Sequence, residues 1–122
     1  MLTKSHSYME SYFTREKYKS VIVEEIELLR ATLNEAESLK KILMKDIVEG
    51  YLNFVVDFKQ CTFIDSTFLS TLVTTLKHLH GKGGDLRLSS VGSEIRSLLE
   101  LTGTAKIFQI FDNKKEAIQS YS

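Results

Sequence analysis

The stretch from Asn53 to Leu76 constrains the fold of this chain more than any other part of the sequence. Its first part, residues 54–58, is a short apolar run suited to a strand that is covered on both faces. Further on, apolar residues recur at the 3.6-residue period of a helix, at Leu69, Leu72, Val73 and Leu76. The stretch therefore predicts a buried strand, a short loop and an amphipathic helix.

Three polar residues mark the start of that helix. Asp65 stands where an N-cap belongs, and its carboxylate can accept a hydrogen bond from the backbone N–H of Thr67 or Phe68. Ser66 and Thr67 then occupy the first turn, where free backbone N–H groups and the helix dipole favour negative charge. A phosphate could be accommodated there, although residues of these types also cap helices for purely structural reasons.

Composition narrows the class of protein. At 122 residues the chain is long enough for one domain whose core needs no disulfide. Lys plus Arg equals Asp plus Glu at 16 each, so charge gives no reason to expect binding to nucleic acid or to an anionic membrane. Cys61 is the single cysteine, which fits a reducing compartment. No signal peptide and no apolar run of roughly 20 residues are apparent, so we expect a cytoplasmic protein with a protein partner.

The N-terminal part leaves two structures open. Residues 1–10 are polar and unpatterned, which predicts a disordered tail. The β-branched run 21–23 favours a strand that pairs with one near Tyr12 and Phe13, whereas apolar spacing across residues 21–31 also fits a helix. A further helix is expected to start near Asn34, itself an acceptable N-cap, and to end at Gly50.

The C-terminal part alternates strands and helices. The run 81–84, GKGG, predicts a turn, and residues 85–91 predict a strand. Ser93 can cap a helix that ends at Gly103, and a last short strand is expected over residues 107–111. A C-terminal helix would begin at Asp112 or Asn113, with an inner face made of Ala117, Ile118 and Tyr121. Such alternation predicts a largely parallel sheet with right-handed crossovers.

Four motifs resemble the STAS domain family, in particular its free-standing anti-sigma factor antagonists. They are VVDF (55–58), TFIDST (62–67), GKGGDLRL (81–88) and LLELTG (98–103), and the resemblance extends over roughly residues 19–122. It implies a single α/β domain over residues 11–122. The implied architecture is a mixed, mostly parallel central sheet with an N-terminal hairpin and about four helices. The hairpin is thereby favoured over the helix for residues 21–31.

The same resemblance assigns a role to the helix start. In that family the serine after the aspartate is phosphorylated by a partner kinase, and this position is Ser66, with Thr67 as the second candidate. Asp65, Ser66, Thr67 and Phe68 would then form the surface that binds the partner and switches. The family usually has glycine where Phe68 stands. Phe68 is interpreted either as an aromatic at the edge of the core or as an anchor that faces the partner.

No residue set points to a catalytic centre, a metal site or a cofactor. Asp57 and Asp65 both follow strands, at the sheet edge where sites often form, but nothing beside them supplies a nucleophile. His78 and His80 are two residues apart, so we expect His78 in solvent and His80 on the apolar face of the helix. Cys61 has no histidine placed to act as its base and is interpreted as a small hydrophobic residue.

The resemblance implies a non-enzymatic switch protein. Unphosphorylated, it would bind a partner that combines serine-kinase and anti-sigma activity and so release that partner's other ligand. Phosphorylated at Ser66, it would no longer bind; ATP and magnesium belong to the kinase, and a serine phosphatase would be a further partner. The alternative is a constitutive scaffold subunit of a larger complex, for example one associated with transport. An enzyme that uses Cys61 or Asp65 is the third hypothesis.

Overall fold

The computed structural model describes residues 12–122, so the expected tail over residues 1–10 lies outside the described residues. A five-stranded sheet has the order β1-β2-β4-β6-β7, in which β1 and β2 are antiparallel and all other neighbours are parallel. The mixed, mostly parallel sheet is therefore confirmed. Its strands are β1 (Phe13–Tyr18), β2 (Val21–Ile26), β4 (Asn53–Asp57), β6 (Asp85–Ser89) and β7 (Ile110–Phe111).

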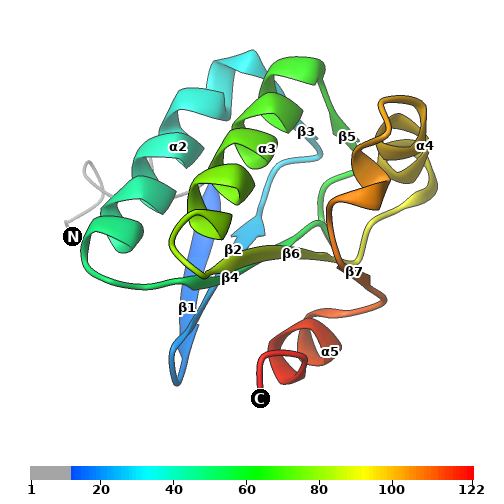
Figure 1. Cartoon of the computed structure of the whole chain (residues 1–122). Helices are drawn as coiled ribbons and strands as arrows, with labels where there is room; N and C mark the ends of the chain where they lie inside the picture. Colours follow the sequence, from blue (N-terminus) through cyan, green and yellow to red (C-terminus); the bar gives the residue numbers. More distant parts are fainter. Residues whose placement is uncertain (1–11) are drawn as a thin grey trace, which may run out of the picture.

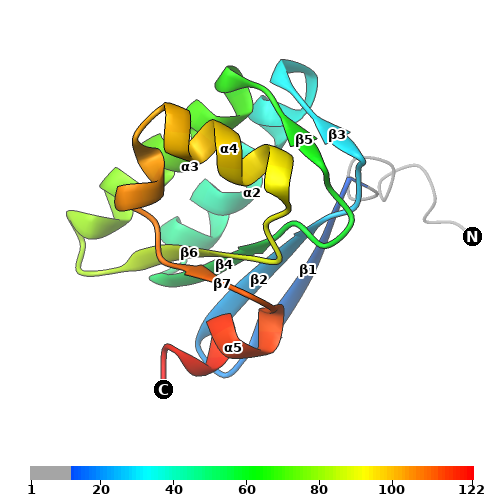
Figure 2. The same cartoon turned by 90° about the vertical axis from the view of Figure 1, so that its right-hand side faces the viewer.

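Two helices cover one face of this sheet, α2 (Leu33–Val48) and α3 (Ser66–His80). They lie side by side, and α5 (Lys114–Gln119) lies across the opposite face (Figure 1). The turned view shows α4 (Ser93–Leu101) on the same side of the sheet as α2 and α3 (Figure 2). A 3₁₀ turn, η1 (Thr104–Lys106), follows α4. Within residues 12–122, no helix combines the length and the apolar character needed to span a bilayer.

The N-terminal hairpin forms as the resemblance implied, and the helical alternative for residues 21–31 is wrong. β2 pairs with β1 on one side and β4 on the other, and Val21, Ile22 and Val23 are all buried. A separation of four residues, as between Ile22 and Ile26, places both side chains on one face of a strand as well as of a helix. Leu29, which a helix would place on its apolar face together with Ile22 and Ile26, is 69% exposed.

Two helix starts differ from the sequence-based expectation by one or two residues. Thr32, not Asn34, is the N-cap of α2: its side chain accepts from Asn34 N–H, and Glu35 Oε1 accepts from Thr32 N–H at 2.9 Å. This reciprocal pair is a capping box. Ser93 is the first residue of α4 instead of its cap, which is Gly92. The last strand is also shorter than expected, because Ile107 ends η1.

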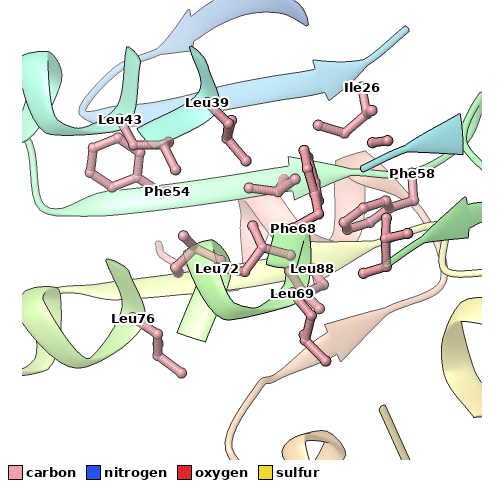
Figure 3. Packing of buried hydrophobic residues seen from close by; sticks show 14 of the residues in the cluster. Ile26, Leu39, Leu43, Phe54, Phe58, Phe68, Leu69, Leu72, Leu76 and Leu88 are labelled. Carbon is pink, nitrogen blue, oxygen red and sulfur yellow. The ribbon is translucent and has the colours of Figure 1, made fainter. Parts of the chain in front are cut away.

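The main core lies between the sheet and the α2–α3 layer. Side chains from both helices meet those of the central strands there (Figure 3). The largest contributions come from residues that are less than 2% exposed, among them Leu39, Leu43, Phe54, Leu72, Leu76 and Leu88. A smaller cluster on the other face joins Val21, Val23 and Val55 to Ala117 of α5. Tyr121 holds this second layer to the sheet: its hydroxyl lies 2.8 Å from Phe54 O and 2.9 Å from Asp85 O, either of which can accept its one proton, and it accepts from Phe54 N–H at 3.2 Å.

The turn between α3 and β6 depends on one close approach of two backbones. Gly84 N–H donates to Leu79 O at 2.8 Å, and Asp85 N–H donates to Leu52 O at 2.9 Å. A Cβ atom at Gly84 would lie 2.4 Å from Leu52 O, which is backbone and has little room to move. Gly81, in the same turn, has its nearest atom at 3.4 Å and an ordinary φ of −65°.

We therefore predict that Gly84→Ala lowers the free energy of unfolding by about 1–3 kcal/mol, the usual cost of forcing an extra group into a packed site. Gly81→Ala is the matched control and should change it by less than about 0.5 kcal/mol. Urea melts of both variants measure the difference. Equal stability of the two variants would contradict the close approach.

One residue of the sheet is buried although its side chain carries a carboxyl group. Glu24 in β2 is 1% exposed, and neither of its carboxylate oxygens has a hydrogen-bond partner among the described residues. Burial, followed by the nearby Asp46 carboxylate, raises the pKa of Glu24 from 4.5 to about 8. Glu24 is therefore held as the neutral acid near pH 7, since burial penalises its charged form.

This residue should make the stability of the protein fall as pH rises. The unfolded chain releases the Glu24 proton near its ordinary pKa of 4.5, whereas the folded chain retains it up to a pKa of about 8. Between these two pH values, Glu24 lowers the free energy of unfolding by up to about 1.4 kcal/mol for each pH unit. Glu24→Gln should abolish this contribution, so its stability relative to wild type should increase from pH 5 to roughly pH 8 and then level off. Urea melts at several pH values measure the difference in stability between Glu24→Gln and wild type. A difference that does not change with pH would contradict the assignment of Glu24 as a neutral acid.

Candidate functional site

The expected site at the start of α3 is built on the Asp65 carboxylate. Oδ1 of Asp65 accepts from Phe68 N–H at 2.8 Å, which confirms Asp65 as the N-cap of α3. Oδ2 accepts from Leu33 N–H at 2.9 Å, in the first turn of α2. One side chain therefore satisfies a free backbone donor at the start of each of two neighbouring helices.

A small parallel sheet holds the two helix starts at the same end of the domain. It joins β3 (Arg30–Ala31) to β5 (Phe63–Ile64), each of which lies just before one of the helices. Asp65 N–H also donates to Ala31 O at 3.3 Å, next to these paired strands. On the outer side, the Arg30 guanidinium lies 3.9 Å from the centre of the Phe63 ring, a cation–π contact. The position of Asp65 is thus set by backbone pairing.

Ser66 and Thr67 are both exposed, as expected from their places in the first turn. They line one end of a groove of about 670 Å³ between α2 and α3. Hydroxyl side chains continue along the α3 wall of the groove at Ser70, Thr71 and Thr74. The α2 wall contributes Leu33, an apolar side chain that is 63% exposed. An accessible serine and an exposed leucine therefore share the mouth of one groove.

The local charges around Ser66 are mixed. Its backbone N–H belongs to the first turn of α3, where free donors and the helix dipole favour an anion. Asp65 lies beside it and would repel a phosphate. Lys40 of α2 lines the same groove and is exposed, whereas Glu37 brings an opposite charge. Because these contributions oppose one another, a phosphate on Ser66 would change the charge of the surface while leaving the helix cap in place.

Phe68 belongs to the core. Its side chain is 0% exposed and points into the cluster that contains Ile26 and Phe58 (Figure 3). The interpretation of Phe68 as an anchor that faces the partner is therefore wrong, because no part of the ring reaches the surface. The aromatic ring instead fills part of the core between α3 and the sheet.

The other candidate residues have structural roles. Asp57 is 3% exposed and accepts from the hydroxyls of Ser89 and Ser90, at 2.6 and 2.7 Å. It thereby ties the end of β4 to the end of β6. Cys61 is 1% exposed, and burial raises the pKa of its thiol, which is the opposite of what a nucleophilic cysteine needs.

The two histidines of α3 are both exposed. His80 is exposed and its Nε2 lies 3.0 Å from Asp85 Oδ1, so the expectation that it faces the apolar side is wrong; the helix ends there and the ring turns outward. His78 is exposed as expected. Residues 12–122 contain no group of three or more histidine, cysteine, aspartate or glutamate side chains placed to hold a metal ion.

Sequence reasoning missed two parts of this region. The T-x-x-E pattern of Thr32 and Glu35 was a readable signal for the capping box of α2. The bond from Leu33 N–H to Asp65 Oδ2 joins residues 32 positions apart, so no local pattern indicates it. The hydrogen bond that Asp65 Oδ2 accepts could therefore not be predicted from the sequence.

The comparison with known families agrees with this fold. The STAS domain profile matches residues 20–117, and the chain belongs to the STAS domain family. An anti-sigma F factor antagonist from Paenibacillus polymyxa is 30% identical over 66 residues, which make up 54% of this chain and 56% of that protein. The chain thus spans about half the length of the curated relatives it matches.

Solved structures show the same architecture. A candidate anti-sigma factor antagonist from Thermotoga maritima superposes with a TM-score of 0.81 at 23% identity, covering 93% of this chain and 97% of that one. The Bacillus cell fate determinant SpoIIAA in its phosphorylated form superposes with a TM-score of 0.74 at 16% identity, covering 90% and 99%. At these identities the likeness establishes the fold, a single mixed α/β domain.

The two neighbouring polar residues should respond differently to truncation. Asp65→Ala removes the acceptor for Phe68 N–H and for Leu33 N–H, and we predict a loss of about 1–3 kcal/mol in the free energy of unfolding. Ser66→Ala removes an exposed hydroxyl and should cost less than about 0.5 kcal/mol. Urea melts decide, and a Ser66→Ala loss as large as that of Asp65→Ala would contradict the assigned roles.

Proposed function

We propose that this chain is a non-enzymatic regulatory protein of the anti-sigma factor antagonist type, switched by phosphorylation of Ser66. Unphosphorylated, it binds a cytoplasmic partner that has serine-kinase and anti-sigma activity. Phosphorylated, it is released, and a serine phosphatase restores the binding form. The chain itself uses no cofactor, because ATP and magnesium are held by the kinase.

One observation carries this proposal: the Ser66 hydroxyl is exposed directly beside a carboxylate whose two oxygens are both engaged in the fold. Asp65 holds the backbone of the helix start, which leaves Ser66 free for a kinase to reach. Thr67 is also exposed and is the second candidate acceptor. The relative from Paenibacillus polymyxa is named an anti-sigma F factor antagonist, which supports the same class of partner.

The groove beside Ser66 supports a docking role for this end of the domain. Leu33 is 63% exposed at the mouth of the groove, and Leu29, in the segment before β3, is 69% exposed. Exposed apolar side chains next to a neutral hydroxyl suit a desolvated contact with a partner. A phosphate at Ser66 would bring about two negative charges into that contact beside Asp65. Binding should weaken because the partner surface that meets one neutral hydroxyl is not arranged to compensate them.

The switch is tested by charge substitutions at neighbouring serines. Ser66→Asp should weaken binding to the kinase partner by about tenfold or more, whereas Ser66→Ala should bind as wild type does but resist release by ATP and magnesium. Ser70→Asp is the matched control, because Ser70 is exposed one turn further along the same groove wall. Its effect should be clearly smaller. Calorimetry with the purified partner measures binding, and circular dichroism checks the fold.

Mapping of the modified residue by tandem mass spectrometry completes this test. Phosphate on Ser66 supports the proposal. Phosphate confined to Thr67 or Ser70 would reassign the acceptor. If neither phosphorylation nor Ser66→Asp affects binding in the folded protein, the switch is wrong and the constitutive scaffold takes its place.

A further inference from the structure

A second cavity, of about 610 Å³, lies between the N-terminal hairpin and the C-terminal half of α2. It shares no lining residue with the groove beside Ser66. Phe13 and Ile42 supply apolar walls, and Lys45 and Glu49 are exposed lining residues. The remaining polar lining includes Glu24, the buried carboxyl described above.

Among the described residues Glu24 has no hydrogen-bond donor, although the charge of Arg15 acts on it. Arg15 stands opposite Glu24 in the β1–β2 register. Its guanidinium, however, binds Asp46 of α2 through two hydrogen bonds, from Nε to Oδ2 at 3.0 Å and from Nη2 to Oδ1 at 2.8 Å. A carboxyl group buried without a partner is costly, so a ligand that brings donors to Glu24 recovers a substantial interaction.

We propose that this cavity binds an organic cation, a primary ammonium group on a short apolar stem, with Glu24 as its principal acceptor. The three N–H donors of an ammonium can be shared between Glu24 and Asp46, which retains lone pairs beyond those used by Arg15. The stem packs between Phe13 and Ile42. Because less than 1 Å² of each Glu24 oxygen is exposed, entry requires the Arg15 side chain, itself 42% exposed, to shift.

Other ligand classes fit the cavity less well. Three carboxyl groups line it, from Glu24, Asp46 and Glu49, against two cations, and the charge of Arg15 is already compensated by Asp46. An anion would therefore meet a surplus of carboxyl groups. A divalent metal is disfavoured because these three carboxyl groups are not placed to hold one ion together, and no other group of three or more such side chains in residues 12–122 is.

Binding should release a proton. The charged groups that face Glu24 are Arg15 from β1 and Asp46 from α2, with Lys45 and Glu49 of α2 further out, while its neighbour in β4 is the apolar Val56. Burial and Asp46 raise the pKa of Glu24 to about 8, so the free protein carries the proton near pH 7. An ammonium favours the carboxylate; the Glu24 proton then passes to the buffer as the ion pair forms.

A free small amine and a lysine side chain of a partner protein share this chemistry. Two probes separate these sources: n-butylammonium chloride, and lysine blocked as its N-acetyl amide. Neutral n-butanol has a stem of the same length but no charge. Titrations followed by backbone amide shifts of the full chain should show saturable changes in β1, β2 and the second half of α2. The cation that binds more tightly shows whether the site takes a free amine or a lysine side chain.

Variants and pH make the test specific. Glu24→Gln keeps the neutral shape of the buried acid, so it should fold and yet bind n-butylammonium at least about tenfold more weakly. Glu25→Gln, the next residue, whose partner Lys114 lies in α5 on the other face of the sheet, should bind as wild type does. Affinity should rise by at least about tenfold from pH 6 to pH 8, as Glu24 becomes easier to ionise.

Calorimetry in buffers of different ionisation enthalpy should detect the released proton. Equal binding to folded Glu24→Gln, equal binding of n-butanol, or no saturable shift with either cation would overturn the proposal. In each of these cases Glu24 would not be the acceptor for a cationic ligand. The test does not involve Ser66, so its outcome is independent of the proposed phosphorylation switch.

Discussion

The two hydrogen bonds of the Asp65 carboxylate join the starts of α2 and α3, next to the paired strands β3 and β5. One oxygen caps α3 at Phe68 N–H, and the other holds the start of α2 at Leu33 N–H. The helices therefore begin at a common point and run side by side over the sheet (Figure 1). Because Asp65 carries out both tasks, the next residue, Ser66, has no structural duty and remains exposed. The regulatory role that we propose for Ser66 rests on this difference between the two neighbouring residues.

A charge added at Ser66 should accordingly act on the surface and leave the core unchanged. The groove beside it is bordered by exposed residues, whereas Phe68, two residues further on, is fully enclosed. Core and surface are thus separated within a single helical turn. The cavity at Glu24 is lined by other residues and is built from the hairpin and the opposite end of α2. The two proposed sites are therefore chemically different, a hydroxyl at a helix start and a buried acid.

Local sequence patterns predicted most of the fold because strands and helix caps are determined largely by residues that are close in sequence. The apolar run of β4 and the cap at Asp65 were both readable from neighbouring residues. The hairpin needed the family resemblance, since Ile22 and Ile26 satisfy the periods of a strand and of a helix equally. The burial of Glu24 and the second bond of Asp65 depend on α2, which is distant in sequence, and no periodicity indicates either.

The central claim is that phosphate at Ser66 changes the docking surface while the fold persists. Amide chemical shifts of the phosphorylated and unphosphorylated chain, compared together with their urea midpoints, test it most directly. We expect shift changes confined to the start of α3, strand β5 and the first turn of α2, with little change in the urea midpoint. Changes that spread through β2, β4 and β6, or a large fall in the midpoint, would contradict the account, because Asp65 would then have failed to hold both helices.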